Sequence, residues 1–488
     1  MSSLSFADQK NAGPYAGKQV ETYGAQEVHL DSNGREIYVI SDLHLASGLN
    51  PNSNFEGTEN FYADDSFGRF MDHLQNRLGS RKAIFIINGD FIDFLRIKNI
   101  PARGDLSTWH AILKNVGINK AEDELQKSIV KKEREYGLKT DDYKSVWKLH
   151  VCIRGHKKVF EQLAMWLMRG NQLIIVKGNH DLEWYWKAVR DYLSYWLSDF
   201  IAQKGNGSQG LSALVSKNLL FVDNALLIDK MMYIEHGHRY QNTTEVKGEP
   251  VLKNSSELNL PFGSFFNRYL VNRLELTYPY LDNIRPTQKI LPFLIRERFP
   301  LAIKVLFQYL PFTVLIIPKK LYKQTFKYLL NFLFLIIIPL GVTAYAVWQS
   351  WPKQAIKNDP PFLIAQGLNV VKNFGFLFLS YVFGRIMEML SLKDSGSLLK
   401  SAKPYLEKFQ VVTFGHTHNP EQRNESNKWF FNTGTWIPVF ETSSADVRMD
   451  KTYTFLEIQN NGLLHPVPLK RWNDDAGRDE FLGLNDKQ

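Results

Sequence analysis

Five short apolar runs, each followed within three residues by Asp, Asn or His, place the strongest constraint on how this chain can fold. Each run is rich in Ile, Val and Phe, which predicts a buried strand flanked by turns. Helical patterns over about 66–79, 143–169 and 183–203 lie between them. Strands that alternate with helices predict an α/β domain built on a largely buried sheet. The runs are REIYVISDLHL (35–45), KAIFIINGDFID (82–93), QLIIVKGNHD (172–181), MMYIEHGH (231–238) and FQVVTFGHTH (409–418).

The chain of 488 residues is long enough for more than one unit, and its patterns divide it into one α/β domain and two insertions. The strand patterns KWFFNTGTW and KTYTFLEI follow the fifth run, so we expect the domain to close near the carboxyl end. We expect a helical, charged insertion at about 94–142. Its basic stretch KSIVKKEREY (127–136) predicts a helix that is either a solvated face or a contact with an anionic substrate or membrane. The expected organisation is a polar lead-in (1–35), the domain (36–240 and 406–470), a hydrophobic helical insertion (241–405) and a polar tail (471–488).

Metal-binding or proton-transferring side chains follow every one of the five runs. Loops at the carboxyl ends of sheet strands are where α/β proteins build their sites. In D-x-H and H-x-H, two extended residues on the same side of the strand can address one point. A single H-x-H is more often two histidines with ordinary hydrogen-bond partners, and a single G-D is usually a turn or a helix cap. The prediction of a site therefore rests on the five motifs taken together. The side chains are Asp42, His44, Asp90, Asp93, Asn179, His180, Asp181, His236, His238, His416 and His418.

In this order the motifs resemble those of the calcineurin-like metallophosphoesterase superfamily. The superfamily pattern D-x-H, G-D-x-x-D, G-N-H-D, H-G-H, G-H-x-H stands here as DLH, GDFID, GNHD, HGH and GHTH. The resemblance covers about 36–240 and 407–460 and leaves both insertions outside. It implies a four-layer α/β/β/α sandwich, a dinuclear metal centre and phosphoester hydrolysis, and it names no substrate.

The resemblance also implies a role for each matched residue. One metal would be held by Asp42, His44 and His418, and the other by Asn179, His236 and His416, with Asp90 bridging both. His180 would donate a proton to the leaving group, and Asp181 would orient it. Asp93 would support the ligands without binding metal. The role of His238 stays open, and a structural role is the preferred interpretation.

The chemistry of the residue types agrees with these roles. Two cations about 3.5–4 Å apart can neutralise phosphate oxygens and activate water near neutral pH. A carboxylate has two acceptor oxygens, so it is the ligand type that can bridge. A nitrogen and oxygen set without sulfur suits Mn, Fe or Zn. An imidazole can supply the proton that a leaving alkoxide needs. We therefore expect two divalent metal ions of one of these kinds.

The second insertion contains YLLNFLFLIIIPLGVTAYAVW (328–348), an uncharged stretch long enough for one membrane crossing. The apolar run 361–390 is a weaker candidate because it carries Lys372 and Arg385. The motifs before and after the insertion must meet at one site, so the chain crosses an even number of times or not at all. The alternatives are a spanning hairpin of 328–348 and 361–390, a hairpin lying at the membrane surface, and a soluble helical lid.

Composition narrows the class of function further. The formal charge of +9 and pI of about 9.2 suit nucleic acid, an anionic membrane surface or a phosphorylated substrate. Cys152 is the sole cysteine, which excludes an intramolecular disulfide. The first residues lack a signal-peptide pattern, and basic residues flank the 328–348 stretch, so we expect a membrane-associated protein with a cytoplasmic catalytic domain, or else a cytoplasmic protein.

The sequence thus predicts a metal-dependent phosphoesterase whose substrate is membrane-associated or amphiphilic and could be lipid-linked. A soluble nucleotide or protein phosphatase, and a nuclease, are alternatives in which the hydrophobic insertion acts as a lid. Nucleic acid is the less favoured partner. A noncatalytic membrane adaptor is the least favoured interpretation, because no metal ligand of the pattern is missing. The sequence leaves the oligomeric state open.

Overall fold

The computed structural model divides the chain into two units, Met1–Leu310 with Gly396–Gln488, and Pro311–Ser395. The predicted hairpin of 328–348 and 361–390 lies in the second unit, outside the described residues apart from Gly341 and Tyr345. Among the helices that the structure describes, none combines the length and the apolar character that a membrane crossing requires. The structure describes residues 20–22, 25–50, 58–205, 211–253, 255–276, 297–305, 397–439, 451–460 and 464–483, with single residues at 52, 54, 55, 294, 322, 326, 341 and 345.

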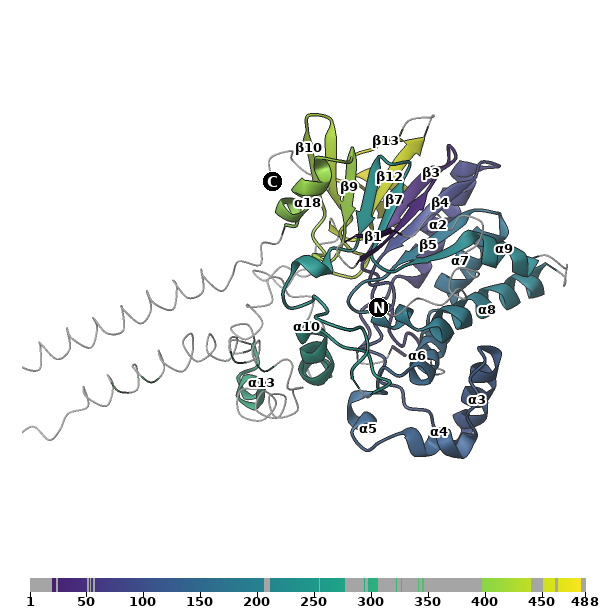
Figure 1. Ribbon diagram of the computed structural model, residues 1–488, viewed down its shortest axis with the longest axis vertical. Helices are drawn as coiled ribbons and strands as arrows, with labels where there is room; N and C mark the ends of the chain where they lie inside the picture. The colour runs from purple at the N-terminus through teal and green to yellow at the C-terminus, as the bar shows by residue number, and fades with distance from the viewer. Residues whose placement is uncertain are drawn as a thin grey trace, which may run out of the picture. The chain divides into compact units, whose positions relative to one another are not determined.

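The first unit is a mixed α/β fold with two sheets (Figure 1). The eight-stranded sheet has the order β15-β14-β12-β3-β4-β5-β6, with β13 beside β12. Its strands β3 to β6 run parallel, and β12 lies antiparallel to β3. Its strands are β3 (Glu36–Ile40), β4 (Ala83–Asn88), β5 (Gln172–Val176), β6 (Leu219–Val222), β12 (Thr454–Asn460), β13 (Leu464–Pro466), β14 (Lys470–Asn473) and β15 (Arg478–Phe481).

The seven-stranded sheet has the order β1-β2-β7-β8-β9-β11-β10. Its central pair, β8 and β9, is parallel, although the second insertion separates the two strands in the sequence. Predicted strands 231–238 and 409–418 thus become neighbours, as their motifs require. The strands are β1 (Val20–Thr22), β2 (Ala25–Leu30), β7 (Ala225–Ile228), β8 (Met232–Glu235), β9 (Val411–Phe414), β10 (Glu421–Glu425) and β11 (Lys428–Asn432).

Alternate residues of the central strands pack into different parts of the core. Ile37 and Val39 of β3 join one apolar cluster that also contains Ile234 of β8 and Val411 of β9, so this cluster contains side chains of both sheets. The intervening Tyr38 and Ile40 pack instead in a cluster with helical side chains. Each fully buried aliphatic side chain contributes about 1.5–3 kcal/mol. Burial on both faces explains why these strands are almost continuously apolar.

The helices whose side chains pack with Tyr38 and Ile40 cover the eight-stranded sheet, and α18 (Leu399–Leu406) packs against the seven-stranded sheet through Ala402 (Figure 1). Helix α2 (Asp64–Leu78) buries Phe67, Phe70, Met71, Leu74 and Leu78, which share one face at helical spacing. The three predicted helical segments are confirmed. They correspond to α2, to α6 (Asp142–Gly155) with α7 (Lys157–Met168), and to η2 (Leu182–Tyr185) with α8 (Lys187–Lys204); α9 (Leu211–Asn218) follows.

The first insertion forms η1 (Arg103–Asp105), α3 (Leu106–Asn115), α4 (Glu122–Ser128) and α5 (Glu133–Tyr136). The prediction of one helix over 127–136 is wrong, because α4 ends at Ser128 and α5 begins at Glu133. The buried carboxylate of Glu133 accepts hydrogen bonds from the backbone of Val130 and Lys139 and pairs with Lys144 at 2.8 Å. Its side chain therefore stabilises a turn at the point where a helix would continue.

The predicted ends of the domain, at 36 and 470, are also wrong. Strand β2 pairs with β7 and buries Val28 and Leu30, and strand β14 buries Trp472. Polar residues separate these few apolar side chains in the sequence. The sequence pattern therefore predicts that both segments lie outside the domain. Ion pairs also hold the tail, since Arg77 Nη1 lies 3.1 Å from Asp479 Oδ2.

The start of the second insertion packs on the loops that follow β4 and β5. It forms α10 (Phe262–Phe266), the π-helical η4 (Asn267–Val271) and α11 (Asn272–Glu275), and α13 (Phe299–Lys304) follows. Ser264 Oγ donates to the backbone oxygen of Asn179 at 3.1 Å, and Asn272 Nδ2 donates to that of Leu95 at 2.7 Å. The described residues 241–276 are therefore part of the surroundings of the motif loops.

Candidate metal centre

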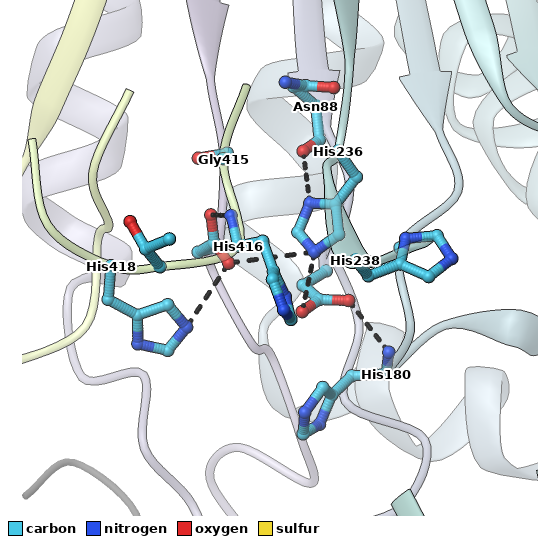
Figure 2. Close-up of polar contacts among 12 residues, drawn as sticks. Asn88, His180, His236, His238, Gly415, His416 and His418 are labelled. Atoms are coloured by element: carbon cyan, nitrogen blue, oxygen red, sulfur yellow. Dashed lines mark hydrogen bonds and ion pairs between the residues drawn. The ribbon is translucent and has the colours of Figure 1, made fainter. Parts of the chain in front are cut away.

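The five motif loops meet at the carboxyl ends of strands from both sheets. Strands β3, β4 and β5 are parallel neighbours, and so are β8 and β9, so each set of loops lies at one sheet edge. A hydrogen bond joins the two edges, because the backbone N–H of His416, after β9, donates to the side-chain oxygen Oδ2 of Asp42, after β3, at 2.9 Å. Within the seven-stranded sheet, Gly415 N donates to His236 O. Figure 2 shows the side chains of His180, His236, His416 and His418 gathered in this region.

Asp42, His44 and His418 form the first of three groups that could hold a metal ion. His418 Nε2 lies 3.3 Å from Asp42 Oδ1, and His44 Nε2 lies 3.8 Å from it. The two imidazole nitrogens are 3.0 Å apart. All three side chains are buried. The structure thus brings together the three residues that the resemblance assigns to one metal.

Asp90, His236 and His416 form the second group. His236 Nε2 lies 3.1 Å from Asp90 Oδ2, and the same carboxylate oxygen lies 3.7 Å from His44 Nε2 of the first group. A single carboxylate therefore stands between the two groups, as a bridging ligand would. Asn179 is buried close by, since the next residue, His180, donates its backbone N–H to Asp90 Oδ1 at 2.8 Å.

Several buried polar atoms in this region lack a hydrogen bond of normal geometry to any described residue. They include Asp42 Oδ1, Asn179 Oδ1 and His236 Nε2. Leaving such atoms unsatisfied in a protein interior costs about 1–3 kcal/mol each. All three are nitrogen or oxygen donors of the types that bind Mn, Fe or Zn. The donor set therefore fits divalent cations, and these groups could hold them.

In three of the four candidate histidine ligands, one ring nitrogen has a hydrogen-bond partner outside the group. His44 Nδ1 lies 3.3 Å from Asp93 Oδ2, and His236 Nδ1 donates to the backbone oxygen of Asn88 at 2.8 Å. His416 Nε2 lies 2.9 Å from Gln241 Oε1. Such partners determine which ring nitrogen keeps its proton, so that the other ring nitrogen is the one that can bind a cation.

His44, Asp93 and His180 form the third group, but its surroundings differ from those of the first two. Asp93 Oδ2 lies 2.8 Å from His180 Nδ1 and 3.2 Å from Arg96 Nε. The buried guanidinium already neutralises this carboxylate, so the group is better described as a hydrogen-bonded support for two histidines. The resemblance implies a supporting role for Asp93, and these contacts agree with it.

The prediction that Asp181 orients His180 is wrong. Asp181 accepts hydrogen bonds from the backbone N–H groups of Phe91 at 2.9 Å and Gly178 at 2.6 Å. Its side chain therefore joins the loops after β4 and β5, and Asp93 holds the His180 ring instead. Adjacent residues in an irregular loop point in different directions, so the neighbour in sequence was the wrong choice. Burial, followed by the charge of Asp90, raises the pKa of Asp181 to about 7.

The backbone at the centre adopts conformations that L residues rarely use. Five candidate ligands have positive φ angles: Asp42 (54°), His44 (52°), Asp90 (50°), His416 (71°) and His418 (58°). Each such residue costs roughly 1–2 kcal/mol, and such strain concentrates at functional sites. A Cβ on Gly178 would lie 2.1 Å from Asp90 Oδ1, so the glycine is required for the close approach. The motif glycines thus make room for the ligands.

The electrostatics of the centre favour ionised carboxylates. Burial alone would raise the pKa of Asp42 and Asp90, but the charge of His236 and hydrogen bonds from histidines hold both well below the usual range. Burial would lower the pKa of His236, yet the charges of Asp90 and Asp42 raise it to about 9. The ionised carboxylate is the form that binds a cation, and it prevails near neutral pH.

His238 belongs to none of the three groups, so the structure places it beside the ligands without assigning it a cation. Its ring centre lies 5.5 Å from that of His236 and 6.4 Å from that of His416. Burial lowers the pKa of His238 to about 3, so the ring is neutral. Its Nδ1 is buried without a hydrogen bond to a described residue.

No family model matches the chain, and no curated protein matches it either. The motifs and the geometry of the centre are therefore the basis for proposing a function.

Sequence reasoning missed Arg96, Gln241 and Thr244. Arg96 contacts Asp93 from three residues further along the chain, and Thr244 Oγ1 lies 3.3 Å from His416 Nε2. None of these residues belongs to a motif. Arg96 was detectable only as a charged residue in an otherwise apolar stretch, and the other two carry no sequence signal.

Proposed function

We propose that this protein is a metal-dependent phosphoesterase with two metal positions that share Asp90. The observation that carries the proposal is the place of Asp90 Oδ2, 3.1 Å from His236 Nε2 and 3.7 Å from His44 Nε2. Asp42, His44 and His418 would hold one divalent ion, and Asn179, His236 and His416 the other. The two sheets and their helices would then form the α/β/β/α sandwich of the calcineurin-like metallophosphoesterases.

Divalent cations at these positions would supply positive charge to phosphate oxygens and lower the pKa of water enough for nucleophilic attack. The protein's own contribution is to fix the ligands and to move a proton. His180 Nδ1 is held by Asp93, so Nε2 is the nitrogen that can deliver a proton to the leaving oxygen. Burial lowers the pKa of His180, but the charges of Asp93 and Asp90 raise it above its usual value overall. This upward shift favours the protonated imidazolium, which is the form that a general acid needs.

We further propose that the substrate is amphiphilic and that the protein contacts membranes from the cytoplasmic side. The uncharged stretch 328–348, with basic residues in the flank KKLYKQTFK (319–327), supports this proposal. Flotation of the full-length protein with anionic and neutral vesicles tests it. Recovery in the vesicle-free fractions under both conditions would favour the soluble-lid alternative.

The reaction is tested with generic phosphomonoesters and phosphodiesters and with phospholipid head-group esters, in the presence of Mn, Zn or Fe. We expect turnover that requires added metal, and we expect Asp90→Asn to lose the second metal equivalent and turnover together. An Asp90→Asn variant with two bound metals and wild-type turnover would refute the bridging role. A metal-replete wild-type protein that is inert on every ester would refute the proposed function.

A further inference from the structure

His416 differs from His44 and His236 in the origin of its hydrogen-bond partner. Asn88, which accepts from His236, is the last residue of β4, and Asp93, which holds His44, lies in the loop after β4. The partner of His416 is Gln241, whose Oε1 lies 2.9 Å from His416 Nε2. Gln241 is the first residue of the second insertion, which the sequence motifs leave outside the site. The insertion thus contacts a ligand directly.

The directions of the neighbouring hydrogen bonds determine which ring nitrogen of His416 carries the proton. Thr244 Oγ1 lies 3.3 Å from His416 Nε2, and the same hydroxyl donates to the backbone oxygen of His238 at 2.7 Å. Toward His416 the hydroxyl therefore acts as an acceptor, as does the amide oxygen of Gln241. Two acceptors facing Nε2 require the proton on Nε2. Nδ1 is then unprotonated and can bind a cation.

Backbone hydrogen bonds make Gln241 a fixed partner. The backbone N–H of Gln241 donates to His238 O at 3.3 Å. The N–H groups of Thr244 and Glu245 donate to Gln241 O at 3.1 and 3.0 Å. Thr243 O accepts from Gly263 N at 2.7 Å, which ties the turn to the start of α10. The position of the Gln241 side chain thus depends on how the insertion begins.

We propose that Gln241 is a positioning residue that fixes the Nε2-protonated tautomer of His416 and thereby sets the affinity of the second metal position. This inference rests on the proposed two-metal centre. It makes the beginning of the second insertion part of the metal site, and no longer only an anchor or lid. The loss of such a partner of a metal-bound histidine typically weakens metal affinity about 10–100-fold.

The test is a Mn²⁺ titration of metal-free full-length protein, with free Mn²⁺ followed by electron paramagnetic resonance. Gln241→Met keeps the side-chain length but removes the acceptor. We expect wild type to bind two equivalents, and Gln241→Met to bind one with unchanged affinity and one about 10–100-fold more weakly. Gln241→Glu retains an acceptor, and it should restore the second equivalent.

Gln203→Met, on the exposed surface of α8, controls for the replacement itself and should bind as wild type does. Two equivalents with wild-type affinities in Gln241→Met would overturn the inference, as would a Gln241→Glu variant that stays as weak as Gln241→Met. Equal weakening of both equivalents, together with a lower melting temperature, would show a general structural role and also overturn it. A wild-type protein that binds fewer than two equivalents would instead refute the proposed centre.

Discussion

His180 Nδ1 lies 2.8 Å from Asp93 Oδ2, the oxygen that Arg96 Nε also approaches to 3.2 Å. This arrangement leaves His180 Nε2 as the nitrogen available for proton transfer, and it provides a negative charge that stabilises the imidazolium. Arg96 is itself held by the buried Glu275 of α11. The support of the proposed acid therefore extends from the loop after β4 into the second insertion.

Replacing His180 by Gln should separate proton donation from metal binding. His180 is outside the first two ligand groups, so we expect His180→Gln to keep both metal equivalents. Turnover should fall by about 10²–10⁴-fold, the usual contribution of a general acid. Steady-state kinetics and elemental analysis of the same preparation measure the two effects. A loss of metal in His180→Gln would show that the third group also binds a cation.

Asp181→Asn is the matched comparison, because Asp181 is adjacent in sequence but bonded to backbone. Asparagine offers a single acceptor oxygen where the carboxylate has two, so the N–H of Phe91 or Gly178 loses its partner. We expect unfolding to become easier by about 1–3 kcal/mol, with turnover close to wild type. Chemical unfolding and kinetics test this. A turnover loss as large as that of His180→Gln would restore Asp181 as the residue that orients the acid.

Gly89→Ala should disturb the second metal position specifically. Gly89 has a φ of 83°, and a Cβ there would lie 2.3 Å from His236 Nδ1. Gly34 is the control, because it has a φ of 74° and a Cβ added there would meet no atom within 4 Å. Both alanine variants carry backbone strain of roughly 1 kcal/mol, but only Gly89→Ala should displace His236. Elemental analysis of the metal bound to Gly89→Ala and to Gly34→Ala tests this prediction. Equal metal content in the two variants would contradict it.

The strands that build the centre were predictable because they are buried on both faces. Ile84 and Ile86 of β4 join one apolar cluster while Phe85 and Ile87 join another, and such double burial leaves a continuous apolar signal. Strand β2 gives no such signal, because its few buried residues, Val28 and Leu30, alternate with polar ones. The division of the strands between two sheets also depends on pairing between distant segments, which a local pattern does not encode.

In the candidate site, too, the features that follow a local sequence pattern were predictable and those that depend on tertiary contacts were not. Asp42, Asp90 and the motif histidines were predictable because each follows a strong strand pattern at a fixed spacing. The partners of His180 and His416 were not predictable, because the sequence offers both Asp93 and Asp181 as partners for His180, and Gln241 lies in no motif. Which carboxylate or amide meets a ring depends on loop backbone angles such as the φ of 54° at Asp42. These angles follow from tertiary contacts.

The buried His156 should give the fold a distinctive alkaline pH dependence. Its two ring nitrogens lie 3.1 Å from carboxylate oxygens of Asp64 and Glu59. Burial alone would lower the pKa of His156, but the charge of Glu59 and the hydrogen bonds that the ring donates to both carboxylates raise it to about 10. Since the folded pKa lies above the ordinary value of 6.5, this stabilisation is complete below about pH 6.5 and is lost as pH rises through about 10.

Removal of the imidazolium leaves Glu59 and Asp64 without their cation, so His156→Gln should be less stable than wild type at neutral pH. A broken buried ion pair costs about 3–5 kcal/mol. The difference should shrink as pH approaches 10, because the wild-type ring then loses its own charge. Urea unfolding of both full-length proteins between pH 6 and 10 measures this difference, with His465→Gln, at an exposed position of β13, as the control for removal of a histidine. A difference that stays constant over this range would show that His156 is held by packing alone.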